Sequence, residues 1–560
     1  MSSITSECRI SGTQFVISDE DQAMLSKLAP CIGGNPFEYP LPTLSPLERQ
    51  RRRMAFRNDH ALYHRKCDKT GKQIISLYDI DSPFTIYNVN LWWGDEWDPL
   101  DYGRDFDLSR SFFEQFAELQ RVVPRLAMNG AGNENCEYTS YVGWSRNCYL
   151  TFTADRNEDC YFGAYASDNK DCCDFLFTFD SELCYEVIDC KNCYHCLYSY
   201  NLENCSDCIL SRDLIGSQNC FGSIGLRNKQ YHFFNEPLSK EEYETRLKAL
   251  RLDTYSGLMR AKTLVKEFFL TFPHKALEIK GSENVQGDHI KFSRNCYSAY
   301  DIDKVEDCRY VSHFINSKDC MDFDYYGDGS ELCYEISSSV DLKSSFACIN
   351  SWQGNSELLY CELMSNSKNC FGSIGLRNAQ YCIFNKQYTK DAYEALLPQI
   401  IEHMRQTGEW GEFFPAQLSP YAYNETVAQD YLPLSKEEVL TRGLKWKEKK
   451  EKTSYQGPEI ELLDSIADVD ESICKEILLC EETGDPYKII PQELKFYKKW
   501  KLPLPRRSPN QRYLDRMGAR NPRKWWKRPC GNCKKEIFST YDSERPELIY
   551  CEDCYRSKVY

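Results

Sequence analysis

Four cysteines near the C-terminus form the motif in this sequence that is best suited to chemistry. Cys530 and Cys533 are the first Cys-x2-Cys pair, and Cys551 and Cys554 follow as the second pair after seventeen residues. Each pair can place two thiolates on one edge of a tetrahedron, so this spacing is typical of a zinc ribbon. Because all four ligand positions are filled, we predict one closed, structural Zn²⁺ site, with disulfides between the pairs as the alternative interpretation.

The N-terminal part of the chain carries a second copy of this region. The copy lies at a constant offset of 463 residues, which brings Cys530 onto Cys67. The other three ligands are replaced there by Thr70, Asn88 and Leu91. A further ribbon-like pattern with one surviving cysteine precedes each copy, at Cys8 and at Cys480. We therefore expect zinc-ribbon-like modules at both ends of the chain and zinc in the last ribbon only.

The elements between these ends are predicted by a long repeat. Twenty of the 29 cysteines lie between Cys136 and Cys382, mostly at a spacing of twelve residues. Each repeat joins a short aromatic, β-prone run to a turn of Asn, Asp, Ser or Lys, which predicts a strand and a corner. The strings QNCFGSIGLRNKQYHFFN and KNCFGSIGLRNAQYCIFN close two copies of one module. Repeats that cannot bury a core alone stack into a solenoid, so we predict a mainly β fold with a duplicated, parallel β-helix-like β-solenoid.

Two features of this solenoid stay open. One or two repeats could close each coil, and the bulky Tyr and Phe side chains favour the wider coil of two repeats. An antiparallel meander with twelve-residue steps is the alternative fold. The cysteines are expected to be small buried side chains, because free Cys is among the most buried residue types. A ladder of thiolates for metal or redox chemistry is the alternative.

Five cysteines lie closer together than the repeat requires: Cys190, Cys193, Cys196, Cys205 and Cys208. Residues three apart on a strand face opposite sides, so these thiols could bind a metal only at a corner. We favour packing for them as well.

Helix-forming segments follow each half of the solenoid and are expected to cap it. Ser239 and Thr389 each precede an acidic first turn and apolar residues at helical spacing. The expected organisation is a degenerate paired ribbon-like module at 1–125, solenoid half 1 at 126–235, a helical insertion at 236–280, solenoid half 2 at 281–387, a helical and aromatic connector at 388–440, and a paired module with the intact zinc ribbon at 441–560.

Charge is unevenly distributed along the chain. The net charge is −15, of which residues 131–440 carry −18, whereas residues 441–560 carry +6. A basic, Trp-containing segment in this last region could bind phosphates and stack on bases. Its candidate residues are Arg506, Arg507, Arg512, Arg516, Arg520, Arg523, Lys524, Trp525, Trp526, Lys527 and Arg528. The equally weighted alternative is that the segment docks on the protein's own acidic centre.

Composition excludes several classes of protein. No stretch approaches the roughly eighteen apolar residues of a membrane-spanning helix, and the first residues do not resemble a secretory signal. We therefore expect a cytoplasmic protein with reduced cysteines and no membrane partner. The sequence contains no HExxH, GxSxG, P-loop or GxGxxG motif. No catalytic residues and no cofactor other than one zinc ion are predicted.

Several specific sequence strings, spread over nearly the whole chain, indicate a resemblance to a known family. GEWGEFFP, SPYAYNETVA, WDPLDYGRDFD and NCFGSIGLRNKQY resemble a family of uncharacterised Cys-rich, zinc-ribbon-containing proteins of small-genome candidate-phyla bacteria. Members of that family more often keep complete Cys-x2-Cys pairs, and commonly have Cys where this chain has Ser223 and Ser373. The resemblance implies a protein depleted in metal ligands and supplies no established activity.

Three functions compete on this evidence. The first is a non-enzymatic scaffold or interaction protein with a rigid acidic solenoid and an unknown protein partner. The second is RNA or ribosome binding through the basic ribbon ends. The third is a carbohydrate-active β-helix enzyme, whose paired carboxylates could come from Asp168, Asp174, Asp322, Asp324 and Asp328.

Overall fold

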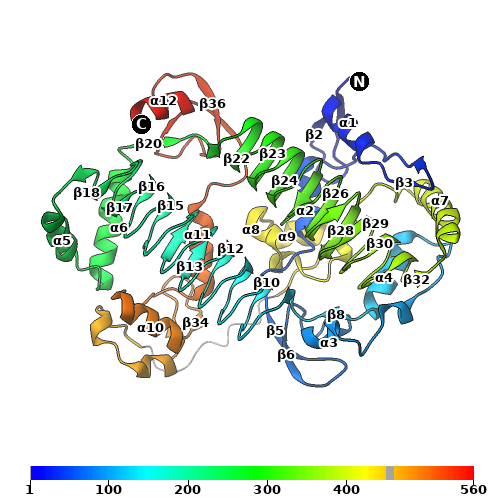
Figure 1. Cartoon of the computed structure of the whole chain (residues 1–560), viewed down its shortest axis with the longest axis horizontal. Coiled ribbons are helices and arrows are strands. Elements are labelled where there is room, and N and C mark those ends of the chain that lie inside the picture. Colours follow the sequence, from blue (N-terminus) through cyan, green and yellow to red (C-terminus); the bar gives the residue numbers. More distant parts are fainter. Residues whose placement is uncertain (1, 449–459, 560) are drawn as a thin grey trace. The chain divides into compact units, whose positions relative to one another are not determined.

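The computed structural model describes residues 2–448 and 460–559, which form two compact units. Unit 1 consists of Met1–Met128 and Leu277–Glu448, and unit 2 of Asn129–Ala276 and Lys449–Tyr560. Unit 1 therefore joins the N-terminal module to the second solenoid half, and unit 2 joins the first half to the C-terminal module (Figure 1). Part of the predicted module at 441–560, residues 449–459, lies outside the described residues.

The first solenoid half is a stack of parallel strands in which each strand pairs with the next one along the chain. Phe152 pairs with Ala164, and Cys173 pairs with Tyr185, so neighbouring coils are offset by twelve residues. One repeat thus forms one coil, and our preference for two repeats in a coil was wrong. The sheet contains β9 (Gly130–Ala131), β10 (Ser140–Gly143), β11 (Phe152–Asp155), β12 (Ala164–Ser167), β13 (Cys173–Leu176), β14 (Tyr185–Ile188), β15 (Tyr200–Glu203) and β16 (Arg212–Ile215).

Each coil has short sides because the backbone turns at every third residue. From Asn135 to Phe234 a positive φ recurs at this spacing, for example 54° at Asn147 and 53° at Asp159. Asn and Asp tolerate this left-handed conformation better than other residues with a side chain, which explains why they so often precede the repeat cysteine. The residue after each such corner points into the coil, as the burial of Cys148, Thr151 and Ala154 shows.

Because of this geometry, the side chains of the clustered cysteines all point into the coil. Because each side holds three residues, side chains three apart occupy the same inward position on successive sides. Cys190, Cys193 and Cys196 are all buried, as are Cys205 and Cys208. The expectation that residues three apart face opposite sides, which holds for a long strand, was wrong here.

The coil interior is filled by small side chains that satisfy their own polar atoms. The thiol of Cys148 lies 3.4 Å from the carbonyl oxygen of Arg146 and 3.5 Å from that of Asn157 in the next coil. The Ser211 hydroxyl makes the same pair of contacts, at 3.0 and 3.4 Å. Thiols and hydroxyls are thus equivalent in filling the interior, and the coil stays narrow because most aromatic side chains lie outside it. Phe175 is an exception in the first half and packs inside the coil, where Gly163 leaves room for its ring.

The outward aromatic side chains form the interface with the end modules. In unit 2, Phe162, Tyr185 and Leu197 pack against Leu494 and Tyr497 of the C-terminal module. In unit 1, the cluster joins solenoid residues to side chains of the N-terminal module and of the connector. It includes Trp92, Phe112, Phe116, Tyr334, Phe346, Tyr360, Phe371, Trp410 and Phe414. Each solenoid half and its module therefore share one core.

The second solenoid half repeats this plan with longer strands. Arg294 pairs with Glu306 and Cys296 with Cys308, again twelve residues apart, while Met321 pairs with Tyr334 across an offset of thirteen. The sheet runs through β21 (Ile279–Lys280), β22 (Glu283–Lys291), β23 (Arg294–Asp303), β24 (Glu306–Ile315), β25 (Met321–Asp324), β26 (Tyr334–Ser339), β28 (Phe346–Ser351), β29 (Asn355–Leu359), β30 (Lys368–Phe371), β31 (Gln380–Ile383) and β32 (Lys386–Gln387).

Helices follow both halves, as the sequence predicts. The first half ends in β17 (Gln218–Phe221), β18 (Gln230–Phe233) and β19 (Glu236–Pro237), and α5 (Lys240–Ala249) and α6 (Tyr255–Phe269) come next. The second half leads into α7 (Lys390–Gln406), followed by α8 (Val427–Tyr431) and α9 (Lys436–Thr441). Ser239 and Thr389 accept hydrogen bonds from backbone N–H groups of α5 and α7. Each is therefore the N-cap residue of the helix that it precedes.

The end modules are built from helices and short two-stranded sheets. The N-terminal module contains β1 (Ile4–Glu7), β2 (Gln14–Ile17), α1 (Asp19–Lys27), α2 (Pro46–Met54), β5 (Tyr63–Lys66), β6 (Gln73–Ser76), β7 (Ile86–Tyr87), α3 (Val89–Trp93), α4 (Phe112–Val122) and β8 (Arg125–Leu126). The C-terminal module contains β33 (Leu478–Leu479), β34 (Pro486–Tyr487), α10 (Pro491–Trp500), α11 (Pro509–Ala519), β35 (Trp526–Pro529), β36 (Glu536–Ser539), β37 (Leu548–Tyr550) and α12 (Glu552–Val559). The two-stranded sheets within each module are antiparallel hairpins except for the parallel pair of β7 and β8.

Candidate metal centre

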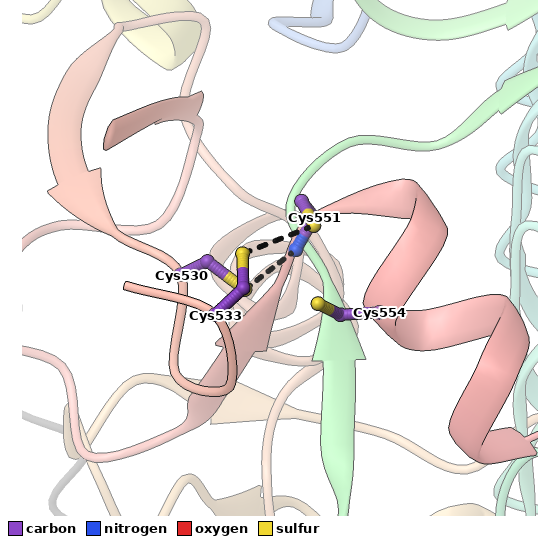
Figure 2. Close-up of side chains that lie close together, drawn as sticks. All are labelled: Cys530, Cys533, Cys551 and Cys554. Carbon is purple, nitrogen blue, oxygen red and sulfur yellow. Dashed lines mark hydrogen bonds between the residues drawn. The ribbon is translucent and has the colours of Figure 1, made fainter. Parts of the chain in front are cut away.

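The four cysteines of the C-terminal motif lie together in the structure. Their sulfur atoms all lie within 4.8 Å of one another, and those of Cys533 and Cys551 are 3.8 Å apart (Figure 2). Cys530 and Cys533 lie in the turn between β35 and β36, while Cys551 follows β37 and Cys554 lies in α12. Four thiolates at this separation can hold a metal ion, and a tetrahedral sulfur set suits Zn²⁺ or iron.

The local backbone holds the first pair in place. The N–H of Cys530 donates to the carbonyl of Lys535 at 2.8 Å, and the N–H of Lys534 donates back to the carbonyl of Cys530 at 3.0 Å. Lys534 has a φ of 63°, which closes this tight turn. The N–H of Cys551, directly after β37, donates to the sulfur of Cys530 at 3.3 Å and so links the two pairs of cysteines through a ligand atom.

These hydrogen bonds bear on the protonation of the thiols. Burial raises the pKa of Cys530, but backbone N–H groups of Cys551, Cys533 and Asn532 outweigh it and lower the pKa to about 6. At Cys551 the N–H of Cys554 lowers the pKa, whereas burial and the neighbouring thiols raise it to about 12. A thiolate therefore forms readily at Cys530, whereas deprotonation of Cys551 is disfavoured, which is the situation that a bound dication relieves.

Within residues 2–448 and 460–559, this is the one group of three or more such side chains close enough to share a metal ion. The five clustered cysteines of the first solenoid half do not form such a group. Burial raises the pKa of Cys190 well above its ordinary value, while side-chain hydrogen bonds with Cys190 and Cys196 lower the pKa of Cys193, so it is the separation of the sulfur atoms that argues against a metal site there.

The three degenerate ribbons keep the turn of the intact one. The N–H of Cys67 donates to the carbonyl of Lys72 and that of Gly71 to the carbonyl of Cys67, at 2.9 and 2.8 Å. Cys8 and Cys480 begin turns with the same two hydrogen bonds. A hydroxyl from Ser11, Thr70 or Thr483 takes the place of the second cysteine, and it lowers the pKa of the remaining thiol against the effect of burial.

The second pair of ligands has been replaced by helix caps, a role that the sequence analysis missed. Cys551 directly precedes α12, and the equivalent residues Ser45, Asn88 and Ser508 directly precede α2, α3 and α11. Each of these three accepts a hydrogen bond from a backbone N–H in the first turn of its helix. The signal in the sequence is a Ser or Asn followed by Pro or an apolar residue at a former ligand position.

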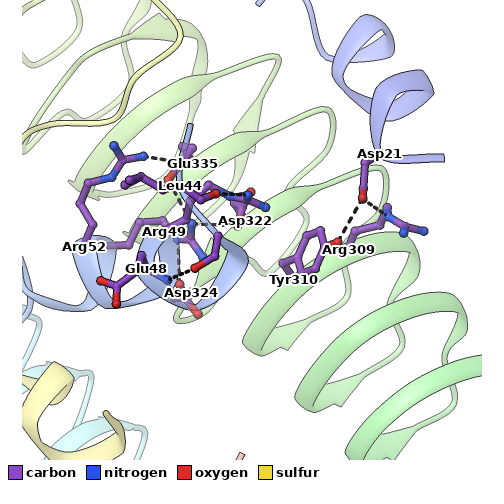
Figure 3. Close-up of polar contacts among 12 residues, drawn as sticks. Asp21, Leu44, Glu48, Arg49, Arg52, Arg309, Tyr310, Asp322, Asp324 and Glu335 are labelled. Atoms are coloured by element: carbon purple, nitrogen blue, oxygen red, sulfur yellow. Dashed lines mark hydrogen bonds and ion pairs between the residues drawn. The ribbon is translucent and has the colours of Figure 1, made fainter. Parts of the chain in front are cut away.

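The helix α2 binds the second solenoid half through buried charges. Arg53 lies 2.8 Å from Asp324 and 3.0 Å from both Asp322 and Glu335, and these side chains are at most 1% exposed. Arg49 donates to Asp322 at 2.8 Å, next to them (Figure 3). Burial alone would lower the pKa of Arg53, but the carboxylates raise it above its ordinary value. The cluster fixes α2 on coils β25 and β26.

Helix α11 makes the equivalent contacts in unit 2. Arg512 lies 3.0 Å from Asp174 and 2.9 Å from Glu493, and Arg516 lies 2.6 Å from Asp174. Arg520 follows the helix, lies 3.0 Å from Asp189 and stacks on Phe177. These three nucleic-acid candidates are thus engaged with acidic residues of their own unit.

The other candidates of the basic segment lie nearer the surface. Arg507 contacts Glu481, Glu482 and Asp515 at 2.8 to 3.3 Å, and the Arg506 guanidinium stacks 4.0 Å from the ring of Tyr255. Around the hairpin β35–β36, Arg523, Trp525, Trp526 and Arg528 are half-buried and Lys524 and Lys527 are exposed. Trp525 contacts the exposed Phe538, over which Lys527 also lies.

The comparisons with known proteins give little support for any assignment. No protein-family model and no curated protein matches the chain. One solved structure, described as a "putative acetyltransferase" from Desulfovibrio desulfuricans G20, is similar at 8% identity over 50% of this chain and 76% of that chain, with a TM-score of 0.09. This score is too low to carry an argument. Among the described residues no helix is long and apolar enough to span a membrane.

Proposed function

We propose that the protein is a non-enzymatic scaffold or interaction protein whose C-terminal ribbon is held by one structural Zn²⁺ ion. The observation that carries this proposal is that charged side chains pair with one another inside each unit. The arginines of α2 and α11 and the carboxylates of the solenoid bind one another in buried pairs, so they build a rigid body. A solenoid of this kind offers a long, regular surface to a protein partner.

The carboxylates considered for catalysis support the same reading. Asp322 and Asp324 lie against Arg53, and Asp174 lies against Arg512 and Arg516. Asp168 accepts two hydrogen bonds from Arg156, and Asp328 accepts one from Asn316. A glycosidase needs one carboxyl group as an acid and another as a base or nucleophile, and carboxylates in such pairs are poorly suited to either role. We therefore rank a carbohydrate-active enzyme last.

Zinc and a reducing compartment, the cytoplasm, are part of this proposal. Thiolate ligands and columns of buried thiols persist only where cysteines stay reduced. Elemental analysis of the purified chain should give about one zinc per chain, and the double variant Cys530→Ser/Cys533→Ser should contain none. The variant Cys8→Ser is the matched control, because it changes a degenerate ribbon and should keep the metal. Iron in place of zinc, or no metal in the wild type, would refute the zinc assignment.

The scaffold role itself is tested by its partner. Cross-linking in the native host, followed by purification of the tagged chain, should recover one protein in near-stoichiometric amounts. The same protein should be lost or reduced with the Cys530→Ser/Cys533→Ser variant if the ribbon contributes to the interface. Turnover of a substrate by the purified chain would contradict the non-enzymatic assignment.

A second candidate function rests on the hairpin β35–β36. Lys524 and Lys527 are exposed there, Trp525 and Trp526 are half-buried, and Phe538 is 48% exposed. Cations and aromatic rings thus lie together near the surface, as in single-strand nucleic-acid binding. Fluorescence anisotropy with a labelled uridine oligonucleotide should show binding that weakens with salt and is lost in Trp525→Ala/Lys527→Ala. This function would be excluded if the affinity for the oligonucleotide did not change with salt concentration or in the double variant.

A further inference from the structure

Unit 2 contains a cavity of about 470 Å³ next to the base of the zinc-ribbon module. Its walls come from coil β16, from helix α6, from β20 (Pro273–Lys275) and from the loop before β37. Four cationic side chains line it, namely Arg212, Lys262, Lys266 and Arg545, together with the imidazole of His274 and the carboxylate of Glu547. Val265, Phe269, Leu270 and Pro546 supply an apolar wall. Both the size and the mixture of apolar and polar lining fit a small-molecule site.

The equivalent place in unit 1 is filled by a buried ion pair. Arg125 binds both carboxylate oxygens of Glu362, which also accepts from Gln120 at 2.9 Å, and Arg125 donates to Tyr78 at 3.1 Å. Both members of the pair are at most 1% exposed. This site therefore carries one cation and one anion and has no free charge to offer.

The duplication allows the two places to be matched residue by residue. Arg125 pairs with Ile86 across β8 and β7, and His274 pairs with Ile549 across β20 and β37, so His274 occupies the position of Arg125. Glu362 corresponds to Arg212, at the 150-residue offset that also relates Cys370 to Cys220. Tyr78 corresponds to Tyr541, which accepts from Arg212 at 2.8 Å.

Most of the substitutions between the units add a cation to the site, whereas two oppose this trend, because the cation Arg125 corresponds to the neutral His274 and Phe84 corresponds to the acidic Glu547. The only carboxylate of the unit 1 pair, Glu362, is replaced by the guanidinium of Arg212. Phe113 and Ala117 of α4 correspond to Lys262 and Lys266 of α6, and Ser82 corresponds to Arg545. Unit 2 has thus lost the buried pair of Arg125 and Glu362 and gained four cations and the carboxylate of Glu547 around an open cavity.

Part of this positive charge is neutralised within unit 2. Lys262 lies 2.7 Å from Glu186, Arg212 lies 3.5 Å from Asp213, and Arg545 binds Glu547. Lys266 is exposed at the cavity and has no carboxylate partner in the described part of the chain. The cavity therefore retains an excess of positive charge.

A buried histidine adds a hydrogen-bond acceptor to this setting. His274 is 3% exposed, and its Nε2 lies 3.1 Å from the carbonyl oxygen of Phe269, so Nε2 carries the proton. Its Nδ1 is buried and has no hydrogen-bond partner. Burial and the nearby Arg212 lower the pKa of His274 to about 4, which keeps the ring neutral at pH 7. A ligand should satisfy Nδ1 with an O–H group.

We infer that this cavity is a binding site for a phosphorylated small molecule that carries hydroxyl groups, such as a sugar phosphate. The phosphate group lies among Arg212, Lys266 and Arg545, where it replaces the missing carboxylate. A hydroxyl of the ligand donates to Nδ1 of His274, and the carbon skeleton lies along Phe269 and Leu270. This site is independent of the scaffold role and of the zinc ion.

Calorimetric titration of the full chain with ribose 5-phosphate, inorganic phosphate and ribose tests this inference. Ribose 5-phosphate should bind at least tenfold more tightly than inorganic phosphate, and ribose should not bind. Lys266→Ala, which introduces the residue of the unit 1 position, should weaken binding of ribose 5-phosphate about tenfold. Arg260→Ala is the matched control, since Arg260 is an exposed cation of α6 that does not line the cavity.

Two further variants separate the roles of the residues. Arg212→Glu should abolish binding, and His274→Leu should reduce the preference for ribose 5-phosphate over inorganic phosphate while phosphate binding persists. Because these two positions are buried or half-buried, the exposed Lys266 carries the decisive test if either variant fails to fold. The inference is overturned if ribose 5-phosphate does not bind at millimolar concentration, or if Lys266→Ala and Arg260→Ala affect binding equally.

Discussion

At the scale of single residues, the solenoid depends on side chains that accept a left-handed backbone. Asn295 has a φ of 53°, and its side-chain amide donates to Asp307 in the next coil at 2.8 Å. A β-branched residue fits this conformation poorly because its Cβ approaches the following carbonyl oxygen. The Asn and Asp residues before the repeat cysteines thus favour the corner, although residues such as Leu150 and Thr153 also adopt it, with φ values of 49° and 51°.

Asn295→Val should therefore lower the free energy of unfolding by about 1–2 kcal/mol, with an added loss for the missing hydrogen bond. Asn295→Gly is the matched control, because glycine adopts a positive φ without strain and should cost less than the valine variant. Urea denaturation of the two variants measures this difference. Equal stability of the two variants would show that the corner conformation is not the cause.

His274 gives a prediction for the dependence of stability on pH. Its pKa is about 4 in the folded chain because of burial and Arg212, with Asp213 and Glu547 as the nearby acids. The unfolded pKa is higher, at about 6.5, so the unfolded state binds the proton first and stability falls as pH decreases from 6.5 to 4. The loss should reach about 2 kcal/mol at pH 5. Urea denaturation at pH 7 and pH 5 should show a smaller loss for His274→Gln than for the wild type, and identical losses would contradict this account.

At the scale of the elements, buried arginines decide how a helix is attached to the solenoid. Arg53 of α2 is fully buried among Asp322, Asp324 and Glu335. Removing it takes away the ion-pair partner of the buried Asp324 and leaves Asp322 paired with Arg49 and Glu335 with Arg52, which costs far more than losing a surface pair. The ribbon helices are therefore parts of the core of their units.

Arg53→Met should destabilise unit 1 by about 3–5 kcal/mol. Arg9→Met is the control, because Arg9 is 55% exposed in its pair with Glu412 and should cost at most about 1 kcal/mol. Thermal unfolding followed by circular dichroism measures both. If the two variants melt at the same temperature, the buried cluster does not hold α2 in place.

The sequence predicts some of these elements correctly and others not. The twelve-residue period, the Asn and Asp corners and the two Cys-x2-Cys pairs identify the solenoid and the metal site, because each depends on local geometry. The width of the coil was predicted wrongly, since the bulk of Tyr185 does not reveal that it points outward to Tyr497. The partners of Arg53 and Arg516 lie more than 260 residues away in the sequence, and spacing alone does not identify such contacts.

At the scale of the whole molecule, the chain crosses between its two units. The N-terminal module shares its core with coils that begin after residue 277, although the coils that follow it directly in sequence belong to the other unit. Phe112 and Phe116 contact Phe371 and Phe414 within this core. Proximity in the sequence therefore does not show which solenoid half the N-terminal module stabilises.

Deleting residues 2–125 should consequently expose the aromatic face of the second solenoid half. Hydrogen exchange measured by mass spectrometry should show a loss of protection in residues 277–387 that is larger than in residues 129–235, which adjoin the deletion in sequence. The deletion removes Trp92, Phe112 and Phe116 from the core of unit 1 together with Arg53, so both the apolar and the charged attachment of that half are lost. A larger loss in residues 129–235 would mean that the module supports its sequence neighbour instead, and the crossed pairing of ends and halves would be wrong.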